Sequence, residues 1–237
     1  MNQSTSHVNI ILVPGAWADG SSWSKVIEPL QQRGHRVLTA PIPLTSLSDD
    51  RAALDRTIQR TTGPVVLAAH AYAGAVISAT AHERVRALVF IAALTPDEGE
   101  TVAEVFYKEP AHAMAPKLAP TPDGYLWMPD EAFKNAFAQN VGESQARLLS
   151  AIQRPINVRC IQEKAPAPGW RRHPSWFLVA EEDRMINPTT QHFEATRMGA
   201  TVRSEKVDHA PLITAPEMVI DLIINAAQAA AEPARTR

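Results

Sequence analysis

The sequence predicts an α/β fold in which a doubly wound, mostly parallel sheet carries a helical lid insertion. Short apolar runs rich in β-branched residues alternate with longer amphipathic segments, as expected when buried strands alternate with helices that cover both sheet faces. This rhythm breaks between about Pro96 and Arg172. The length of 237 residues suits one α/β domain, which we expect to span residues 1–237.

Six apolar runs are expected to form the strands, because each is short and hydrophobic. In chain order they are Val8–Val13, Arg36–Ala40, Pro64–Ala69, Ala87–Ala92, Trp176–Ala180 and Thr201–Val207. The amphipathic segments between them predict helices at Ser22–Arg33, Asp49–Thr61, Ala73–His82, Thr189–Met198 and Ala215–Ala230. Gly34 is expected to end the first helix, and Asp49 is expected to cap the second.

The segment 96–172 is expected to lie as a lid over the carboxyl ends of the strands, where ligands of open α/β sheets bind. It is rich in proline and aromatic residues, and two helical pieces are visible near Asp130–Gln139 and Gly142–Ile152. The alternative is a long surface excursion without a role. We prefer the lid, because a long segment with many apolar and aromatic residues would be costly to leave in solvent.

Composition argues against several classes of partner. Hydrophobic residues make up 45% of the chain and charged residues 20%, the formal charge is −2, and nothing resembles the basic footprint of a nucleic-acid-binding protein. No apolar stretch approaches the roughly 20 residues that cross a bilayer, so we expect no membrane partner. Met1–His7 lacks the pattern of a signal peptide, which makes the cytoplasm the expected location. The oligomeric state stays open, a homodimer included.

The expected strand Pro64–Ala69 runs directly into His70-Ala71-Tyr72-Ala73-Gly74 and then into an apolar helix. A strand, a tight turn and a helix with small flanking residues form the layout of a nucleophile elbow, whose usual pattern is Gly-x-Ser-x-Gly. The central residue here would be Ala71, and alanines also replace both flanking glycines. Taken alone the match is weak, because an ordinary small-residue turn would explain it.

A second segment supports the elbow. The expected strand Val8–Val13 ends in Pro14-Gly15-Ala16-Trp17. In a fold with a nucleophile elbow, the loop after such a strand supplies one backbone N–H of an oxyanion hole, and the residue after the nucleophile supplies the other. By position these donors would be Ala16 and Tyr72, and Tyr72 would also lie at a helix N-terminus, which favours developing negative charge. The alternative for the first segment is a plain strand-to-helix turn.

Two charged clusters follow the last two expected strands, Glu181-Glu182-Asp183 and Asp208-His209. We expect His209 to act as a base, since histidine changes protonation near neutral pH. Asp183 is the expected carboxylate that orients it, because it lies deepest in its loop, whereas the two glutamates suit a solvated rim. The alternative is a surface histidine that happens to stand next to an acid.

Metal and cofactor chemistry find no support in the sequence. The remaining histidines have no metal-like spacing, and Cys160 is the only cysteine. No glycine-rich loop that could cradle phosphate is present. We therefore expect neither a metal nor a cofactor, and a small-molecule substrate as the partner.

Together these segments resemble the small α/β hydrolases related to plant methyl esterases and hydroxynitrile lyases, and their bacterial esterase-like relatives. The resemblance covers the chain from Val8 to about Ala230 and rests on Leu12-Val13-Pro14-Gly15-Ala16-Trp17, Trp23, Gly34-His35-Arg36-Val37, Ala69-His70-Ala71-Tyr72-Ala73-Gly74, Glu182-Asp183-Arg184-Met185-Ile186 and Asp208-His209-Ala210-Pro211-Leu212. It implies the α/β-hydrolase fold and a Ser–Asp–His triad that cleaves small esters without a cofactor. His209, Asp183, Ala16 and Tyr72 match the base, the acid and the two oxyanion donors.

Two residues depart from the pattern of these families. Pro14 stands where a histidine usually precedes the glycine, which we expect to alter the loop without removing the N–H of Ala16. Ala71 stands where serine is the nucleophile, and a methyl group cannot attack a carbonyl. Removing a triad member leaves only ~10³–10⁴-fold catalysis over water.

Three accounts of Ala71 stay open. In the first, an engineered change has replaced the serine of an esterase-like serine hydrolase. In the second, the alanine is natural, and the His–Asp pair acts as a general base in hydrolysis or lyase chemistry without a covalent intermediate. In the third, the scaffold binds a small molecule and does no chemistry. We place the hydrolase first, because the acid, base and oxyanion elements are all present.

A substrate pocket is expected between the elbow, His209 and the lid. We expect Trp17, His70, Phe106 and Trp127 to border it. Aromatic walls suit a small apolar or aromatic ester. For Phe106 and Trp127 the alternative is packing within the lid.

Overall fold

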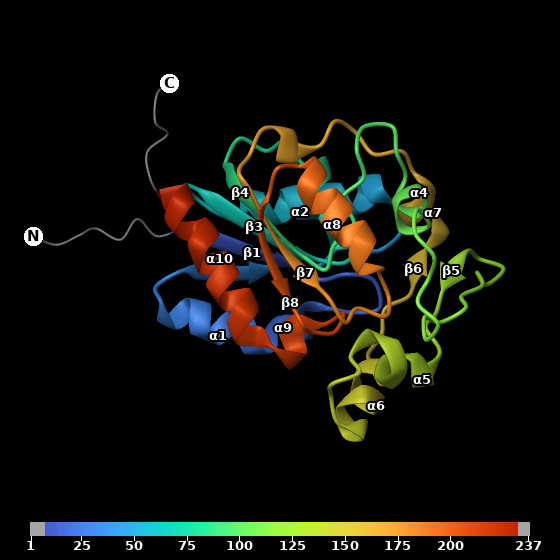
Figure 1. Cartoon of the computed structure of the whole chain (residues 1–237). Coiled ribbons are helices and arrows are strands. Elements are labelled where there is room, and N and C mark those ends of the chain that lie inside the picture. The colour runs from blue at the N-terminus through green and yellow to red at the C-terminus, as the bar shows by residue number, and fades with distance from the viewer. Residues whose placement is uncertain (1–7, 232–237) are drawn as a thin grey trace, which may run out of the picture.

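The computed structural model describes residues 8–231, so Met1–His7, on which the expected location rests, and residues 232–237 lie outside the described part of the chain. Six strands form one sheet in the order β2-β1-β3-β4-β7-β8 (Figure 1). Every neighbouring pair in it is parallel, which confirms the predicted sheet. The strands are β1 (Asn9–Val13), β2 (Arg36–Thr39), β3 (Val65–His70), β4 (Val85–Ile91), β7 (Ser175–Ala180) and β8 (Thr201–Glu205).

The four inner strands are buried along their whole length, apart from Arg86 in β4. Their continuous apolar sequence is required there, because helices cover both faces of a parallel sheet. The register sets Ile11 of β1 opposite Leu67 of β3, and Leu67 opposite Leu88 of β4, so the apolar core runs across the sheet. The edge strands β2 and β8 carry the more polar sequences and are partly exposed.

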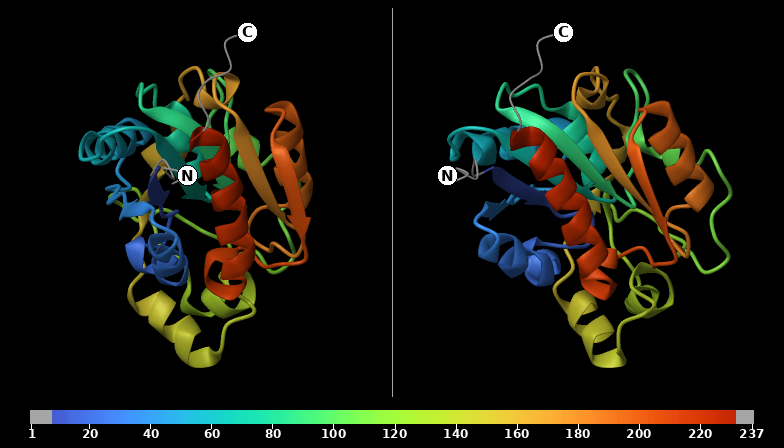
Figure 2. Two further views of the ribbon diagram at one scale, coloured as in Figure 1. Left: turned by 90° about the vertical axis from the view of Figure 1, so that its left-hand side faces the viewer. Right: turned by 60° about the vertical axis from the view of Figure 1, so that its left-hand side comes forward.

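Helices flank this sheet. Figure 2 shows α1 and α10 together on one side, where α10 packs against β3, β4 and β7. α2 packs on α3, α3 contacts β3 and β4, and α8 packs on β7. None of the helices in the described residues combines the length and apolar character that crossing a bilayer requires. The bounds are η1 (Gly20–Trp23), α1 (Ser24–Gln32), α2 (Leu47–Gln59), α3 (Ala73–Ala79), α8 (Pro188–Arg197), α9 (Pro211–Thr214) and α10 (Pro216–Ala231).

Two helix ends show which local signals set them. α2 begins at Leu47, because the Ser46 hydroxyl accepts a hydrogen bond from the Asp49 N–H at 3.0 Å, as an N-cap residue does. The prediction that Asp49 caps this helix was therefore wrong, since Ser46 has the extended backbone of a cap and Asp49 lies inside the first turn. Gly34 follows α1 with a φ of 86°, the left-handed conformation that favours glycine, which confirms the predicted helix end.

Between β4 and β7 the chain leaves the sheet and forms a set of short elements. β5 and β6 pair antiparallel in a separate sheet. The two predicted helical pieces are present, one as α5 followed by the π-helical η2 and one as α6. Figure 1 shows α5 and α6 beyond the ends of β7 and β8. The bounds are α4 (Val102–Phe106), β5 (Tyr125–Leu126), α5 (Asp130–Ala132), η2 (Phe133–Phe137), α6 (Glu143–Ala151), β6 (Ile156–Asn157), α7 (Val158–Gln162) and η3 (Gly169–Arg171).

A buried glutamate joins α8 to the chain after β4. Glu194 is fully buried, and its Oε1 accepts hydrogen bonds from the N–H and the hydroxyl of Thr95. Its Oε2 has no hydrogen-bond partner among the described residues. Arg197 lies near, but its guanidinium bonds the Thr95 carbonyl and Glu100 instead. Burial without a bonded cation raises the pKa of Glu194 from 4.5 to about 8.

This carboxyl group should make the folded protein less stable as the pH rises. Between pH 4.5 and 8 the folded state holds the Glu194 proton more tightly than the unfolded state does, so the group costs about 1 kcal/mol of stability for each pH unit in that window. Glu194→Gln cannot ionise and should remove this loss. We expect the variant to gain stability over the parent between pH 5 and pH 8, measured by urea unfolding at both values. An unchanged difference between the two proteins would contradict the assignment.

Candidate active site

The turn between β3 and α3 has the backbone of a nucleophile elbow. Ala71 lies between the two elements with a φ of 51°, a left-handed conformation that is uncommon and costly for any residue except glycine. Its N–H donates to the Ile91 carbonyl at 3.2 Å, and its own carbonyl accepts from Gly74 at 3.0 Å and Leu94 at 3.1 Å. These bonds on both sides hold the strained residue in place.

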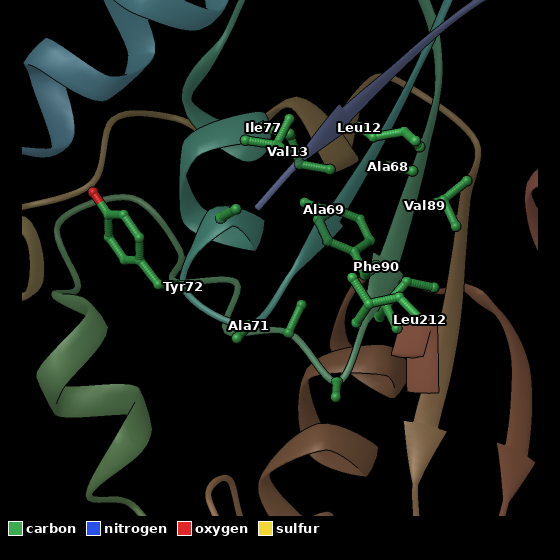
Figure 3. Packing of buried hydrophobic residues seen from close by; sticks show 14 of the residues in the cluster. Leu12, Val13, Ala68, Ala69, Ala71, Tyr72, Ile77, Val89, Phe90 and Leu212 are labelled. Carbon is green, nitrogen blue, oxygen red and sulfur yellow. The ribbon is translucent and has the colours of Figure 1, made fainter. Parts of the chain in front are cut away.

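The orientation of the next amide follows from those bonds. The Ala71 carbonyl points toward the Gly74 and Leu94 amides. Because the described peptide bonds are all trans, the Tyr72 N–H of the same peptide unit points the opposite way. The residues that the structure describes offer no acceptor for this N–H. Figure 3 shows Ala71 at the tip of the turn and Tyr72 beside it.

The loop after β1 lies against this turn. A Cβ added to Gly15 would lie 2.8 Å from the His70 carbonyl oxygen and 3.2 Å from the Ala71 methyl, so only glycine allows this approach. The following N–H, of Ala16, also has no acceptor within residues 8–231. Trp17 anchors the loop, since its N–H donates to the Arg154 carbonyl at 3.0 Å and its indole N–H to the Leu126 carbonyl at 2.9 Å.

The loops after β7 and β8 bring Asp183 and His209 together. Nδ1 of His209 lies 2.8 Å from Oδ2 of Asp183, and both side chains are buried. The other Asp183 oxygen accepts from the Met185 and Ile186 amides at 2.7 and 2.9 Å, and Gln191 donates to Oδ2 at 2.8 Å. These donors fix the Asp183 carboxyl group, and its contact with Nδ1 orients the His209 ring so that Nε2 is the nitrogen left free to act.

His70 supports the loop that carries His209. Its Nε2 lies 2.7 Å from the His209 carbonyl oxygen, and the two rings pack with their centroids 4.7 Å apart. Burial, and then the proximity of His209, lower the pKa of His70 to about 3, so its ring is neutral. A neutral ring that meets a carbonyl oxygen must carry its proton on Nε2. His70 is therefore a fixed hydrogen-bond donor to the backbone of His209.

A cavity of about 570 Å³ lies between the elbow and the elements that follow β4. The expected elbow residue Ala71, the expected base His209 and the two expected oxyanion donors Ala16 and Tyr72 all share its wall. The chain between β4 and β7 supplies most of the remaining wall, and this part is largely apolar. It includes Val102, Phe106, Leu118, Leu126, Ile156 and Ile161.

Of the four aromatic residues expected at the pocket, the structure brings two to the cavity. Trp17 and Phe106 line it. Trp127 does not line the cavity, and its side chain is 51% exposed. Successive residues of an extended chain face opposite ways, and the preceding residue, Leu126, faces the cavity. His70 does not line it either, because its ring turns toward the His209 backbone. The expectation that His70 and Trp127 border the pocket was wrong.

Gln191 is a site residue that the sequence analysis missed. Besides donating to Asp183, its amide oxygen accepts from the Ala180 N–H at 3.0 Å, so it ties the acid loop to the end of β7. The available signal was a polar residue on the same helix face as buried Ala195, four positions later. Within the described residues, no group of three histidine, cysteine or acidic side chains is placed to hold a metal ion.

Comparison with known proteins bears on the fold and the family. A family model described as the alpha/beta hydrolase family matches residues 10–222. Similar solved structures include a polyneuridine aldehyde esterase, with a TM-score of 0.79 and 18% sequence identity over 93% of this chain and 99% of the other. They also include a pyrethroid hydrolase from Sphingobium faniae JZ-2, with a TM-score of 0.81 and 21% identity over 96% of this chain and 100% of the other. An extracellular alpha/beta-hydrolase from a Paenibacillus species is also similar, with a TM-score of 0.77 and 20% identity over 92% of this chain and 98% of the other. No curated protein matches the sequence.

Proposed function

The chain belongs to the alpha/beta hydrolase family, and on that basis we propose that it hydrolyses a small apolar or aromatic ester, with His209 acting as a general base on water. The observation that carries the proposal is the buried contact of His209 with Asp183 beside a cavity whose wall also contains Ala71. With Nδ1 engaged by the carboxylate, Nε2 is the ring nitrogen left to act.

The proposed reaction needs no covalent intermediate. A water molecule attacks the ester carbonyl carbon while His209 Nε2 accepts one of its protons. The negative charge that develops on the carbonyl oxygen is stabilised by the Ala16 and Tyr72 amides, which have no acceptor within residues 8–231. Collapse of the tetrahedral intermediate breaks the bond to the alcohol, and the imidazolium returns its proton to the leaving oxygen. Asp183 stabilises the imidazolium throughout.

The cavity wall supports the proposed substrate class. It contains no aspartate or glutamate, and most of its residues are aliphatic or aromatic. Trp17 and Phe106 provide flat apolar surfaces. A volume of about 570 Å³ is in the range of pockets that bind drug-sized molecules.

A first experiment tests the base. We expect measurable hydrolysis of p-nitrophenyl esters of short aliphatic and aryl acids, and a fall of about 10²-fold or more in His209→Ala, since general-base catalysis contributes that much. His192→Ala is the matched control, because this histidine is exposed and its ring bonds Glu181, away from the cavity wall. Equal rates in the parent and in His209→Ala would overturn the proposal.

Ala71 itself favours a second function, because it removes the nucleophile on which this fold usually depends. On that account the protein binds a small apolar molecule and does not turn it over. Saturable quenching of tryptophan fluorescence by the same esters, without release of p-nitrophenol by either the parent or Ala71→Ser, would favour binding alone.

A further inference from the structure

A buried polar cluster lies behind the elbow, away from the catalytic dyad. Oδ2 of Asp50 accepts a hydrogen bond from the Tyr72 hydroxyl at 2.7 Å, and Oδ1 accepts from the Leu44 N–H at 2.6 Å. The Cys160 thiol lies 3.6 Å from Oδ2. Asp50, Tyr72 and Cys160 are all buried. A carboxylate in this position has no solvent contact, so its arrangement depends on these donors.

The protonation states make Asp50 the common acceptor. Burial raises the pKa of the Tyr72 hydroxyl and of the Cys160 thiol well above their usual values, so both keep their protons and can donate. Burial also raises the pKa of Asp50, to about 6, which leaves it mostly ionised at neutral pH. The cluster is therefore one anion held by two neutral side-chain donors and one backbone amide.

Tyr72 is where this cluster meets the candidate active site. Its backbone N–H is one of the two expected oxyanion donors, and the residue is part of the cavity wall. Figure 3 shows the side chain running away from Ala71, with the hydroxyl at its far end. Its neighbours Ala71, Ala73 and Gly74 have no side chain that could reach another element. Tyr72 therefore provides the side-chain anchor on this side of the turn.

The same cluster joins the elbow to the chain that follows β4. Asp50 lies in the first turn of α2, whereas Cys160 lies in α7. Leu44, whose N–H bonds Asp50, accepts a hydrogen bond at its carbonyl from the Asn157 N–H at 3.0 Å. Leu44 has a φ of 62°, so these two bonds hold a strained backbone in place. Asp50, which binds the Tyr72 hydroxyl, is thereby held in place by residues outside its own helix.

From this geometry we propose that Asp50 is a positioning residue that acts through the Tyr72 hydroxyl to hold the Tyr72 N–H in its oxyanion-binding orientation. The inference rests on the proposed function. Donors aimed at a developing charge stabilise the transition state more than the ground state, and small displacements of them are costly. Losing the anchor should therefore lower kcat and leave KM nearly unchanged.

A double-mutant cycle tests the proposal. Tyr72→Phe removes only the hydroxyl, and Asp50→Asn turns an NH2 group toward either Tyr72 or the Leu44 amide. We expect each variant to lower kcat for p-nitrophenyl esters by about 10-fold, with KM within about 3-fold of the parent. The double variant should lose no more than either single variant, because both act through one contact. Additive losses, or a change in KM alone, would overturn the proposal.

A second measurement keeps this test independent of turnover. If the parent and Ala71→Ser both fail to hydrolyse esters, the proposed function fails, but an oxyanion site can still bind a carboxylate oxygen. The dissociation constant of phenylacetate, measured by calorimetry, should then rise about 10-fold in Tyr72→Phe and in Asp50→Asn without further loss in the double variant. Unchanged affinity for phenylacetate in properly folded single variants would refute the positioning role.

Discussion

Replacing Ala71 by serine is expected to raise the rate of ester hydrolysis by about 10³-fold or more, because a positioned nucleophile accounts for a gain of that order in serine hydrolases. The elbow already has the backbone that the serine requires, with a φ of 51° held by bonds to Ile91, Gly74 and Leu94. Alanine and serine carry the same Cβ at this strained position. The hydroxyl would enter the cavity whose wall includes His209.

The rate gain should depend on His209 and on the position of the new hydroxyl in the elbow. In the serine form, a burst of p-nitrophenol at high enzyme concentration would report the acyl-enzyme, and His209→Ala should abolish it. Ala73→Ser is the matched control: it places a hydroxyl two positions away on a buried side chain that is not part of the cavity wall, and should give no gain. If Ala71→Ser were no faster than the parent, the elbow would not present residue 71 to the substrate.

A methyl group at Gly74 should destabilise the protein by about 3 kcal/mol, or prevent folding. A Cβ there would lie 2.6 Å from the Leu94 carbonyl oxygen and 2.8 Å from the Ala93 Cβ. Both are parts of the chain that follows β4, one a backbone atom and the other fixed to it, so neither can rotate away. Overpacking a rigid site commonly costs 1–3 kcal/mol, and here the added atom also opposes a hydrogen bond of the elbow, from Leu94 to Ala71.

Urea unfolding of Gly74→Ala and Gly142→Ala would measure this effect. Gly142 is the matched control, because an added Cβ meets nothing within 4 Å and its φ of −72° suits any residue. Its position as the N-cap of α6 should limit the change to about 1 kcal/mol. Equal stabilities for the two variants would mean that the turn can move aside, contrary to the close approach described above.

The sheet and the meeting of Asp183 with His209 could be predicted from the sequence for a common reason. Inner strands such as β3 and β7 are buried on both faces, so their sequences are continuously apolar and stand out. Parallel strands also end at one edge of the sheet, so residues that follow β7 and β8 must meet there. The two side chains do meet, at 2.8 Å.

Features that depend on distant parts of the chain could not be predicted in this way. Asp50 looks like one more acid at the start of a helix, next to Asp49, and its burial depends on Leu44, Tyr72 and Cys160. The outward direction of Trp127 follows from β5 and its pairing with β6, about which the local sequence says little. The periodicity of apolar residues predicts whether a segment is a helix or a strand, whereas the orientation of a single side chain depends on its tertiary contacts.

The hydrogen bonds of Trp17 limit how a substrate could enter the cavity. Two hydrogen bonds tie Trp17 to the carbonyls of Arg154 and Leu126, on the chain that covers the cavity. If the chain segment that carries Leu126 and Arg154 moved away from the sheet, it would break both hydrogen bonds. The loop that holds the neighbouring Ala16 amide would then lose its anchor. Opening would therefore displace one of the two proposed oxyanion donors just as the substrate enters. Entry past residues 111–113, which line the cavity and are exposed, would leave both Trp17 hydrogen bonds intact.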